Sequence, residues 1–154
     1  MPSSLTGDSR LSLIDIDATF LPIGQMRQVS RVIRLEGPTI EAEVDLGSDH
    51  WVFREHFPGD PIFPASLIIE AAGQLVALWA WANGLRGRPR LVRTSAEFKH
   101  PVGPKAARIT LVAQVRRKRH IHFGKIEILE QGTQLGLAEA VLAVLPAASE
   151  PVSL

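Results

Sequence analysis

The chain has 154 residues, of which 45% are hydrophobic and 21% are charged. This length and composition predict a single globular domain over residues 1–154 and leave no room for a separate cofactor domain. The chain has no Cys and no Tyr, which excludes disulfides, thiolate metal sites, thiol nucleophiles and phenol acids. The formal net charge of +1 lacks the strong basic excess that is typical of nucleic-acid binders.

The two ends of the chain and its apolar middle indicate the cellular compartment of the protein. Residues 1–10 and 146–154 are predicted to be flexible ends, and the start lacks the basic and apolar regions of a signal peptide. Glu70 interrupts the longest apolar stretch, residues 62–82. Its carboxylate would cost about 2.5–3.5 kcal/mol at the centre of a membrane. We therefore expect a cytoplasmic protein without a membrane-spanning helix.

The hydrophobic pattern predicts strands on both sides of one helix. Residues 27–35 and 39–46 alternate around the turn Gly37-Pro38, which predicts a β-hairpin. Residues 65–82 are apolar on nearly every face and are followed by Asn83-Gly84, which predicts a buried helix. Four strand-like runs come next, at residues 91–98, 107–115, 122–129 and 134–145. This order predicts an α+β fold, with a curved antiparallel sheet around a long central helix.

The segment EHFPGDPIFPASLIIEAAGQ, residues 55–74, carries the residues suited to chemistry. Glu70 is the only charge inside the apolar helix, so its carboxyl is expected to be paired, protonated or functional. A carboxyl in apolar surroundings keeps its proton more readily and suits a general acid, with a partly exposed carboxylate or a structural ion pair as the alternative. His56 precedes a loop stiffened by three prolines, which can hold an imidazole in place as a general base. Gln74 follows Glu70 by one helical turn and can hydrogen-bond its carboxyl.

The start of the predicted helix supplies the remaining site candidates. The first backbone N–H groups, at Ala65 and Ser66, lack helical partners and could bind a developing enolate oxygen. A base, an acid and such a donor suit proton removal next to a carbonyl with loss of a β-leaving group. The candidate substrate-binding residues, for which core packing is the alternative at the apolar positions, are Phe57, Gly59, Ile62, Phe63, Ser66 and Gln74.

The stretch HFPGDPIFPASLIIEAAGQ resembles the hot-dog-fold 3-hydroxyacyl-acyl-carrier-protein dehydratases of the FabZ and FabA types. The match falls on His56, Phe57, Pro58, Gly59, Pro61, Pro64, Leu67, Glu70, Ala71 and Gln74. Weaker similarity extends over residues 21–145. The resemblance implies a hot-dog fold and dehydration of a (3R)-3-hydroxyacyl thioester to a trans-2-enoyl thioester, in fatty-acid or polyketide-like biosynthesis. It implies no metal or organic cofactor.

The resemblance also assigns roles to individual positions. His56 would remove the C2 proton, Glu70 would protonate the departing hydroxyl, and the amide of Ala65 would polarise the thioester carbonyl. A homodimer with shared active sites is implied, and a higher oligomer stays open. The family usually has Gly where this chain has Ala65. Two alternatives therefore remain: a hot-dog acyl thioesterase, and a non-catalytic acyl-binding or partner subunit in which the Ala65 methyl blocks catalysis.

Basic residues gather in two clusters, each of which is either a solvated face or a docking surface for an acidic partner. The first consists of Arg86, Arg88, Arg90 and Arg93, and the second of Arg116, Arg117, Lys118 and Arg119. Acyl carrier proteins are acidic, so the first cluster is the candidate docking site for a carrier protein. Neither a nucleic-acid partner nor a membrane partner is expected.

His120 and His122 lie two residues apart, which places them on one face of a strand. Two imidazoles without a third ligand do not predict a metal site. We interpret both residues as structural or exposed.

Overall fold

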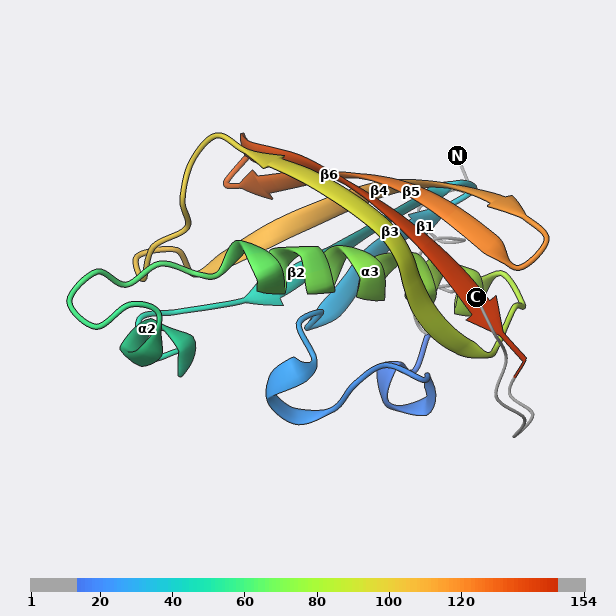
Figure 1. The fold of residues 1–154 in the computed structure, drawn as a ribbon, viewed down its shortest axis with the longest axis horizontal. Helices are drawn as coiled ribbons and strands as arrows, with labels where there is room; N and C mark the ends of the chain where they lie inside the picture. The colour runs from blue at the N-terminus through green and yellow to red at the C-terminus, as the bar shows by residue number, and fades with distance from the viewer. Residues whose placement is uncertain (1–13, 147–154) are drawn as a thin grey trace.

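The computed structural model describes residues 14–146, so most of the two predicted flexible ends lies outside the described residues. One long helix lies along one face of a six-stranded antiparallel sheet with the order β1-β2-β4-β5-β6-β3 (Figure 1). The strands are β1 (Arg31–Glu36), β2 (Thr39–Asp45), β3 (Arg88–Phe98), β4 (Arg108–Lys118), β5 (Ile121–Glu130) and β6 (Thr133–Leu145). The α+β prediction, with an antiparallel sheet around a central helix, is confirmed.

The central helix is α3 (Ala65–Ala82), whose bounds agree with the predicted ones. It begins after Pro64, where a missing N–H costs nothing, and it ends at Asn83 before Gly84, whose φ is +94°. By length and composition α3 could cross a membrane, yet half of its residues are buried by the rest of the chain. It is therefore placed as a core helix. The other helical turns are η1 (Ile16–Ala18), η2 (Gly24–Met26) and α2 (Val52–Glu55), which the hydrophobic pattern did not reveal.

The core lies between α3 and the face of the sheet that α3 covers. Leu75 and Leu78 of α3 are fully buried there, as are Ile109 and Leu111 of β4. A glycine in β5 allows the close approach of the helix, because a methyl group at Gly124 would lie 2.4 Å from Cγ2 of Val76. The distance between helix and sheet is therefore set by the absence of a side chain at this position.

The predicted strand over residues 27–35 begins only at Arg31. The backbone amides of Gln28 and Val29 donate to the side chain of Gln74 on α3, not to a neighbouring strand. A side-chain acceptor on the helix thus replaces the first strand-to-strand hydrogen bonds and connects this segment to α3.

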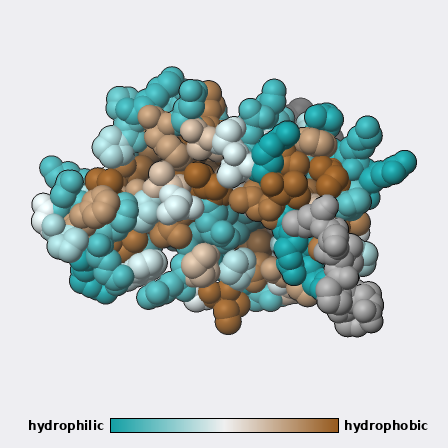
Figure 2. All heavy atoms as spheres, viewed as in Figure 1, coloured by the Kyte–Doolittle hydropathy of each residue, from teal (hydrophilic) through white to brown (hydrophobic). Residues whose placement is uncertain are grey.

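The two edges of the sheet differ in chemistry. On the β1 side, Arg31 pairs with Glu43 at 2.6 Å and also with Asp45, and Arg34 pairs with Glu41 at 3.2 Å. The β3 edge instead exposes apolar side chains, at Leu91 and Val92. Figure 2 shows hydrophobic surface near the middle of the view, where α3 and β3 cross in Figure 1. The β3 edge thus exposes two apolar side chains beside Arg90 and Arg93, which are exposed on the same strand.

Candidate active site

His56 lies at the C-terminal end of α2, where backbone hydrogen bonds fix its position. Its N–H donates to the carbonyl of Val52 at 2.8 Å, and its own carbonyl accepts from the N–H of Ile62 at 2.8 Å. Nδ1 of the ring lies 3.1 Å from the carbonyl oxygen of Ile62. A carbonyl can only accept, so Nδ1 carries the proton and Nε2 of the neutral ring keeps a free lone pair. This tautomer suits a general base.

The loop after His56 folds back on itself. Phe57 and Asp60 exchange two backbone hydrogen bonds, at 3.0 and 2.9 Å, and Gly59 between them has a φ of +81° that glycine adopts without strain. The Phe57 ring is half-exposed and stacks on the His56 ring, with 4.0 Å between the ring centroids. Phe57 thus packs directly against the imidazole, and Gly59 allows the backbone to form the turn. Their substrate-binding roles stay predictions.

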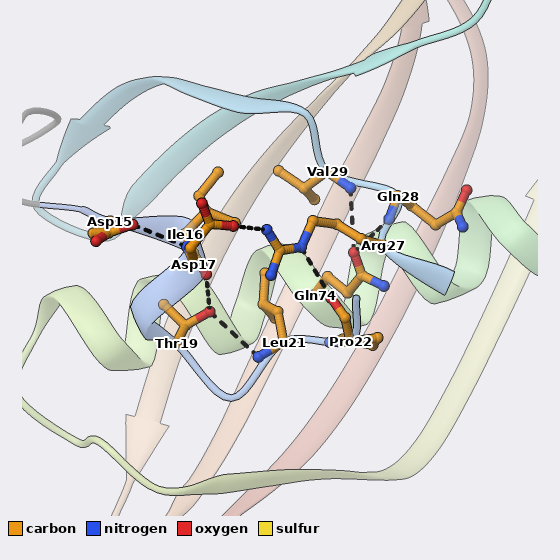
Figure 3. Close-up of polar contacts among 10 residues, drawn as sticks. All are labelled: Asp15, Ile16, Asp17, Thr19, Leu21, Pro22, Arg27, Gln28, Val29 and Gln74. Atoms are coloured by element: carbon orange, nitrogen blue, oxygen red, sulfur yellow. Dashed lines mark hydrogen bonds and ion pairs between the residues drawn. The ribbon is translucent and has the colours of Figure 1, made fainter. Parts of the chain in front are cut away.

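Gln74 fixes the orientation of the Glu70 carboxyl. Nε2 of Gln74 donates to Oε2 of Glu70 at 3.0 Å and to the Met26 carbonyl at 2.8 Å. Oε1 accepts the backbone N–H groups of Gln28 and Val29, at 2.8 and 3.2 Å (Figure 3). Both donors and both lone pairs of this buried amide are therefore used. The predicted hydrogen bond between Gln74 and Glu70 is confirmed, whereas Glu70 itself is half-buried and not enclosed.

Residues 14–29 form a strap that lies over α3 and that the sequence did not reveal. Arg27 holds the strap together, because Nε donates to the Pro22 carbonyl at 2.9 Å and Nη1 to Asp17 at 2.5 Å (Figure 3). The hydroxyl of Thr19 accepts from the backbone N–H of Leu21 at 3.3 Å. The strap is thus closed on itself as well as anchored to Gln74.

A groove of about 350 Å³ lies beside Glu70, between α3, the β3 edge and the strap. Its apolar lining residues include Phe20, Leu21, Ile69, Ala77, Leu91 and Leu142. Glu70, Gln74 and Arg90 are the polar or charged side chains along it. An apolar groove with one oriented carboxyl can hold an acyl chain next to an acid.

The start of α3 forms a second recess. The backbone amides of Ala65 and Ser66 have no hydrogen-bond acceptor within residues 14–146, and both residues are exposed. A depression of about 240 Å³ is lined there by Ile62, Phe63, Ala65, Ile68 and residues 98–102. Phe63 is also part of the core, since its ring lies 6.4 Å from that of Phe53.

His56 and Glu70 are not brought into one pocket within a single chain. Glu70 lines the groove beside β3, while Ala65 lines the recess at the start of α3, and His56 lines neither. The candidate base, the candidate acid and the candidate oxyanion donor thus line no shared pocket of the two described here.

The first basic cluster is only partly free to meet a partner. The Arg86 guanidinium lies 5.2 Å from the centroid of the Trp81 ring, and Nε of Arg88 donates to the Pro146 carbonyl at 3.0 Å. Arg90 and Arg93 are exposed on β3. The cluster therefore divides between two residues that pack against the chain and two that face outward.

The two histidines near the start of β5 have different surroundings. His120 is exposed in the turn, whereas His122 is fully buried, with its ring 5.9 Å from that of Trp79. Neither ring nitrogen of His122 has a hydrogen-bond partner among the described residues. Burial lowers the pKa of His122, which favours the neutral form of its ring. Residues 14–146 contain no group of three His, Cys, Asp or Glu that could hold a metal ion.

A long helix covered by a curved antiparallel sheet is the hot-dog fold. The FabA-like domain family matches residues 21–141. This covers most of the chain, which therefore belongs to the FabA-like family.

Solved structures with the same fold come from several organisms. The dehydratase heterocomplex ApeI:P from Xenorhabdus doucetiae gives a TM-score of 0.69 at 16% identity, over 86% of this chain and 91% of that one. AziG from S. sahachiroi gives a TM-score of 0.56 at 18% identity, over 75% of this chain and 90% of that one. A thioesterase from Staphylococcus aureus gives a TM-score of 0.61 at 15% identity, over 75% of this chain and 92% of that one. At these identities the similarity shows the fold alone.

Proposed function

We propose that the chain is a dehydratase that removes water from a (3R)-3-hydroxyacyl thioester carried on acyl carrier protein and forms the trans-2-enoyl thioester. The observation that carries this proposal is the hydrogen bond from Nδ1 of His56 to the Ile62 carbonyl, which leaves Nε2 free to take a proton. The carboxyl of Glu70, oriented by Gln74, supplies the matching acid.

The reaction follows from these positions. Nε2 of His56 takes the C2 proton, and the electron pair of the broken C–H bond moves toward the thioester carbonyl, whose oxygen accepts from the Ala65 N–H. The electrons then return to form the C2–C3 double bond as the C3–O bond breaks. The hydroxyl leaves as water with the proton of Glu70. A proton transfer from His56 to Glu70 restores the starting state.

A homodimer completes the site in this proposal. Two observations support it: His56 and Glu70 line no common pocket within one chain, and the β3 edge beside the Glu70 groove has no neighbouring strand among the described residues and exposes Leu91 and Val92. A second copy placed against that edge would bring its own His56 to the groove.

Mixed dimers test whether the site is shared. His56→Ala and Glu70→Gln chains should each lose most of their activity alone, and co-expression gives a heterodimer in which one of the two sites has both wild-type residues. Recovery of up to about half of the wild-type rate per heterodimer is expected if each site draws on two chains. No recovery, with the heterodimer shown by mass spectrometry, contradicts a shared site.

The activity itself is tested with a panel of 3-hydroxyacyl carrier-protein substrates and product analysis by mass spectrometry. A product lighter by one water and still attached to the carrier supports the proposal, with His56→Ala as the control. Loss of rate by a factor of about 10²–10⁴ in that variant is expected for a removed general base. No mass change with any substrate contradicts a dehydratase.

A thioesterase is the second candidate, favoured by the thioesterases among the solved structures of the same fold. It would release a free acid and leave the carrier thiol, which the same mass measurement separates from an enoyl product. A non-catalytic partner subunit is the third, since one similar dehydratase is a heterocomplex. It predicts acyl binding without turnover, unchanged by His56→Ala.

The carrier protein is proposed to dock near Arg86, Arg88, Arg90 and Arg93. Substitution of Arg90 and Arg93, the two that face outward, should slow turnover of a carrier-bound substrate more than that of a short diffusible thioester. Equal slowing of both substrates contradicts the docking role.

A further inference from the structure

The groove beside Glu70 has three walls, which come from α3, the strap and the β3 edge. On α3 its lining includes Glu70, Gly73 and Ala77, which share one side of the helix because positions i, i+3 and i+7 lie on one face. The strap contributes residues 20–22, and the edge strand contributes residues 89–91. Glycine and alanine have the smallest side chains, so the helix wall leaves space for a chain that runs from Glu70 toward the C-terminal end of α3.

The groove narrows abruptly after Ala77. A second hollow continues along α3, and Trp81 and Leu85 line only this second space. The residues that line both spaces are Phe20, Leu21, Ala77 and Pro89. The second hollow has a volume of about 10 Å³, against about 350 Å³ for the groove. It could hold at most about one water molecule, so an alkyl chain that follows α3 has to stop there.

Two aromatic rings close the groove at this point. The Phe20 ring of the strap meets the Trp81 ring of α3 edge-on, with 5.9 Å between the ring centroids and 73° between the ring planes. The Arg86 guanidinium lies 5.2 Å from the centroid of the Trp81 ring. A chain that passed the rings would break their contact and would lie near a cation, which is unfavourable for an alkyl group. The pair is therefore a barrier at the end of the groove.

The length of the groove can be converted into a number of carbon atoms. Ala77 follows Glu70 by two turns of the helix, a rise of about 10 Å. An extended alkyl chain advances about 1.25 Å per carbon, because its C–C bonds are about 1.5 Å long. The groove therefore holds about eight carbons between the Glu70 carboxyl and the two rings. With the C3 hydroxyl at that carboxyl, the longest acyl chain that fits has about eleven carbons.

We propose that Phe20 and Trp81 are specificity-determining residues that restrict the substrate to medium-length acyl chains, with an upper limit near eleven carbons. The inference rests on the proposed function in one respect, because it places the reacting C3 at Glu70. Core packing does not account for the pair, since the Phe20 side chain is 47% exposed and Trp81 is half-buried. The limit acts on the apolar tail, so it is the same whether the thioester is dehydrated or hydrolysed.

Binding of unreactive acyl chains tests this limit without any turnover. The probes are saturated acyl-pantetheines of roughly six to sixteen carbons in which an N–H replaces the thioester sulfur. They have no hydroxyl to lose, and the amide resists hydrolysis. Isothermal titration calorimetry gives the Kd of each probe, and the quantity compared between proteins is the chain length at which Kd stops falling.

Three variants are compared with the wild-type protein. Trp81→Ala and Phe20→Ala each remove one ring of the pair, and Phe20→Ala keeps the test decisive if Trp81→Ala fails to fold, because Phe20 is the more exposed ring. Phe123→Ala is the matched control, since its ring is also half-buried but lies on β5 and lines neither hollow. In the wild type, Kd should fall about threefold per added carbon and level off near eleven carbons.

Trp81→Ala should move this limit upward by about four carbons, because Trp81 follows Ala77 by one turn of the helix. Phe20→Ala should move it in the same direction, and Phe123→Ala should leave it unchanged. One limit shared by all four proteins, or a Kd that falls steadily over the whole series in the wild type, overturns the inference.

Turnover of the matching 3-hydroxyacyl thioesters separates this inference from the proposed function. A limit that moves in both ring variants, without dehydration of any substrate, supports the barrier and contradicts a dehydratase. Dehydration with a length limit that neither Trp81→Ala nor Phe20→Ala moves supports a dehydratase and overturns the barrier.

Discussion

Replacing Gln74 by methionine removes the amide that joins α3 to the strap while nearly preserving side-chain volume. Two buried backbone donors, the N–H groups of Gln28 and Val29, then lose their acceptor. Each buried unsatisfied group costs about 1–3 kcal/mol. The Met26 carbonyl and the Glu70 carboxyl lie in more exposed residues, where water can replace the amide.

We therefore expect Gln74→Met to lower the free energy of unfolding by about 3 kcal/mol. For a chain of this length, that corresponds to a fall in Tm of about 6–12 °C. Thermal unfolding followed by circular dichroism measures the change. Gln114→Met is the matched control, because that exposed amide accepts one surface hydrogen bond, from the Thr39 hydroxyl, and its loss should change stability by less than about 0.5 kcal/mol.

A second substitution separates the two functions of the amide. Gln74→Glu keeps an oxygen for the two backbone donors but loses the donor to Glu70 and places a carboxylate beside it. It should be more stable than Gln74→Met, and its turnover should still fall. Hydrogen exchange at the amides of Gln28 and Val29 directly reports their hydrogen bonds to Gln74. A Gln74→Met protein that melts within about 2 °C of the wild type, with both amides still protected, would refute the reasoning.

Three further predictions rest on other parts of the fold. Gly124→Ala should cost about 1–3 kcal/mol of stability in denaturant melts because the methyl would overlap Val76; full stability would contradict the close packing. Burial lowers the pKa of His122, so below pH 6.5 the unfolded chain takes up more protons and stability falls with acidification. His122→Leu should flatten that dependence in thermal melts, though not abolish it, because burial also lowers the pKa of His50; an unchanged slope rules out His122 as a source. Ala65→Gly keeps the N–H and removes the methyl, so kcat/KM for the hydroxyacyl thioester should rise; no change would show that the methyl is no obstacle.

Local chemistry explains why the main helix and part of the site could be predicted. Pro64 and Asn83-Gly84 set the ends of α3 through capping, which needs no tertiary information. Glu70 and Gln74 lie four residues apart on one helix, so their hydrogen bond follows from helical geometry. The alternation of side chains gave the six strands within a few residues of their ends.

The rest depends on contacts between distant parts of the chain. The hydrogen bond from the Gln28 N–H to the Gln74 side chain joins residues 46 positions apart. No local pattern indicates that a helix side chain accepts this N–H in place of a neighbouring strand. The wall of the groove at Phe20 has the same origin. Arg93 and Arg116 share the outer face of the sheet through the register of β3 to β6, which a shift of one residue would undo by turning one of them to the other face.

The contrast between the two sheet edges limits how copies of this chain can assemble. An open edge invites strand addition, and the β1 edge discourages it with charged side chains such as Arg31 and Arg34. A copy that adds through β3 meets another β3, and the joined sheet then ends in two β1 edges. Both of those edges carry the ion pairs of Arg31 and Arg34, which discourage the addition of a third copy. A chain with two edges like β3 could add copies without end. The ion pairs along β1 therefore limit strand addition between copies and oppose fibre formation.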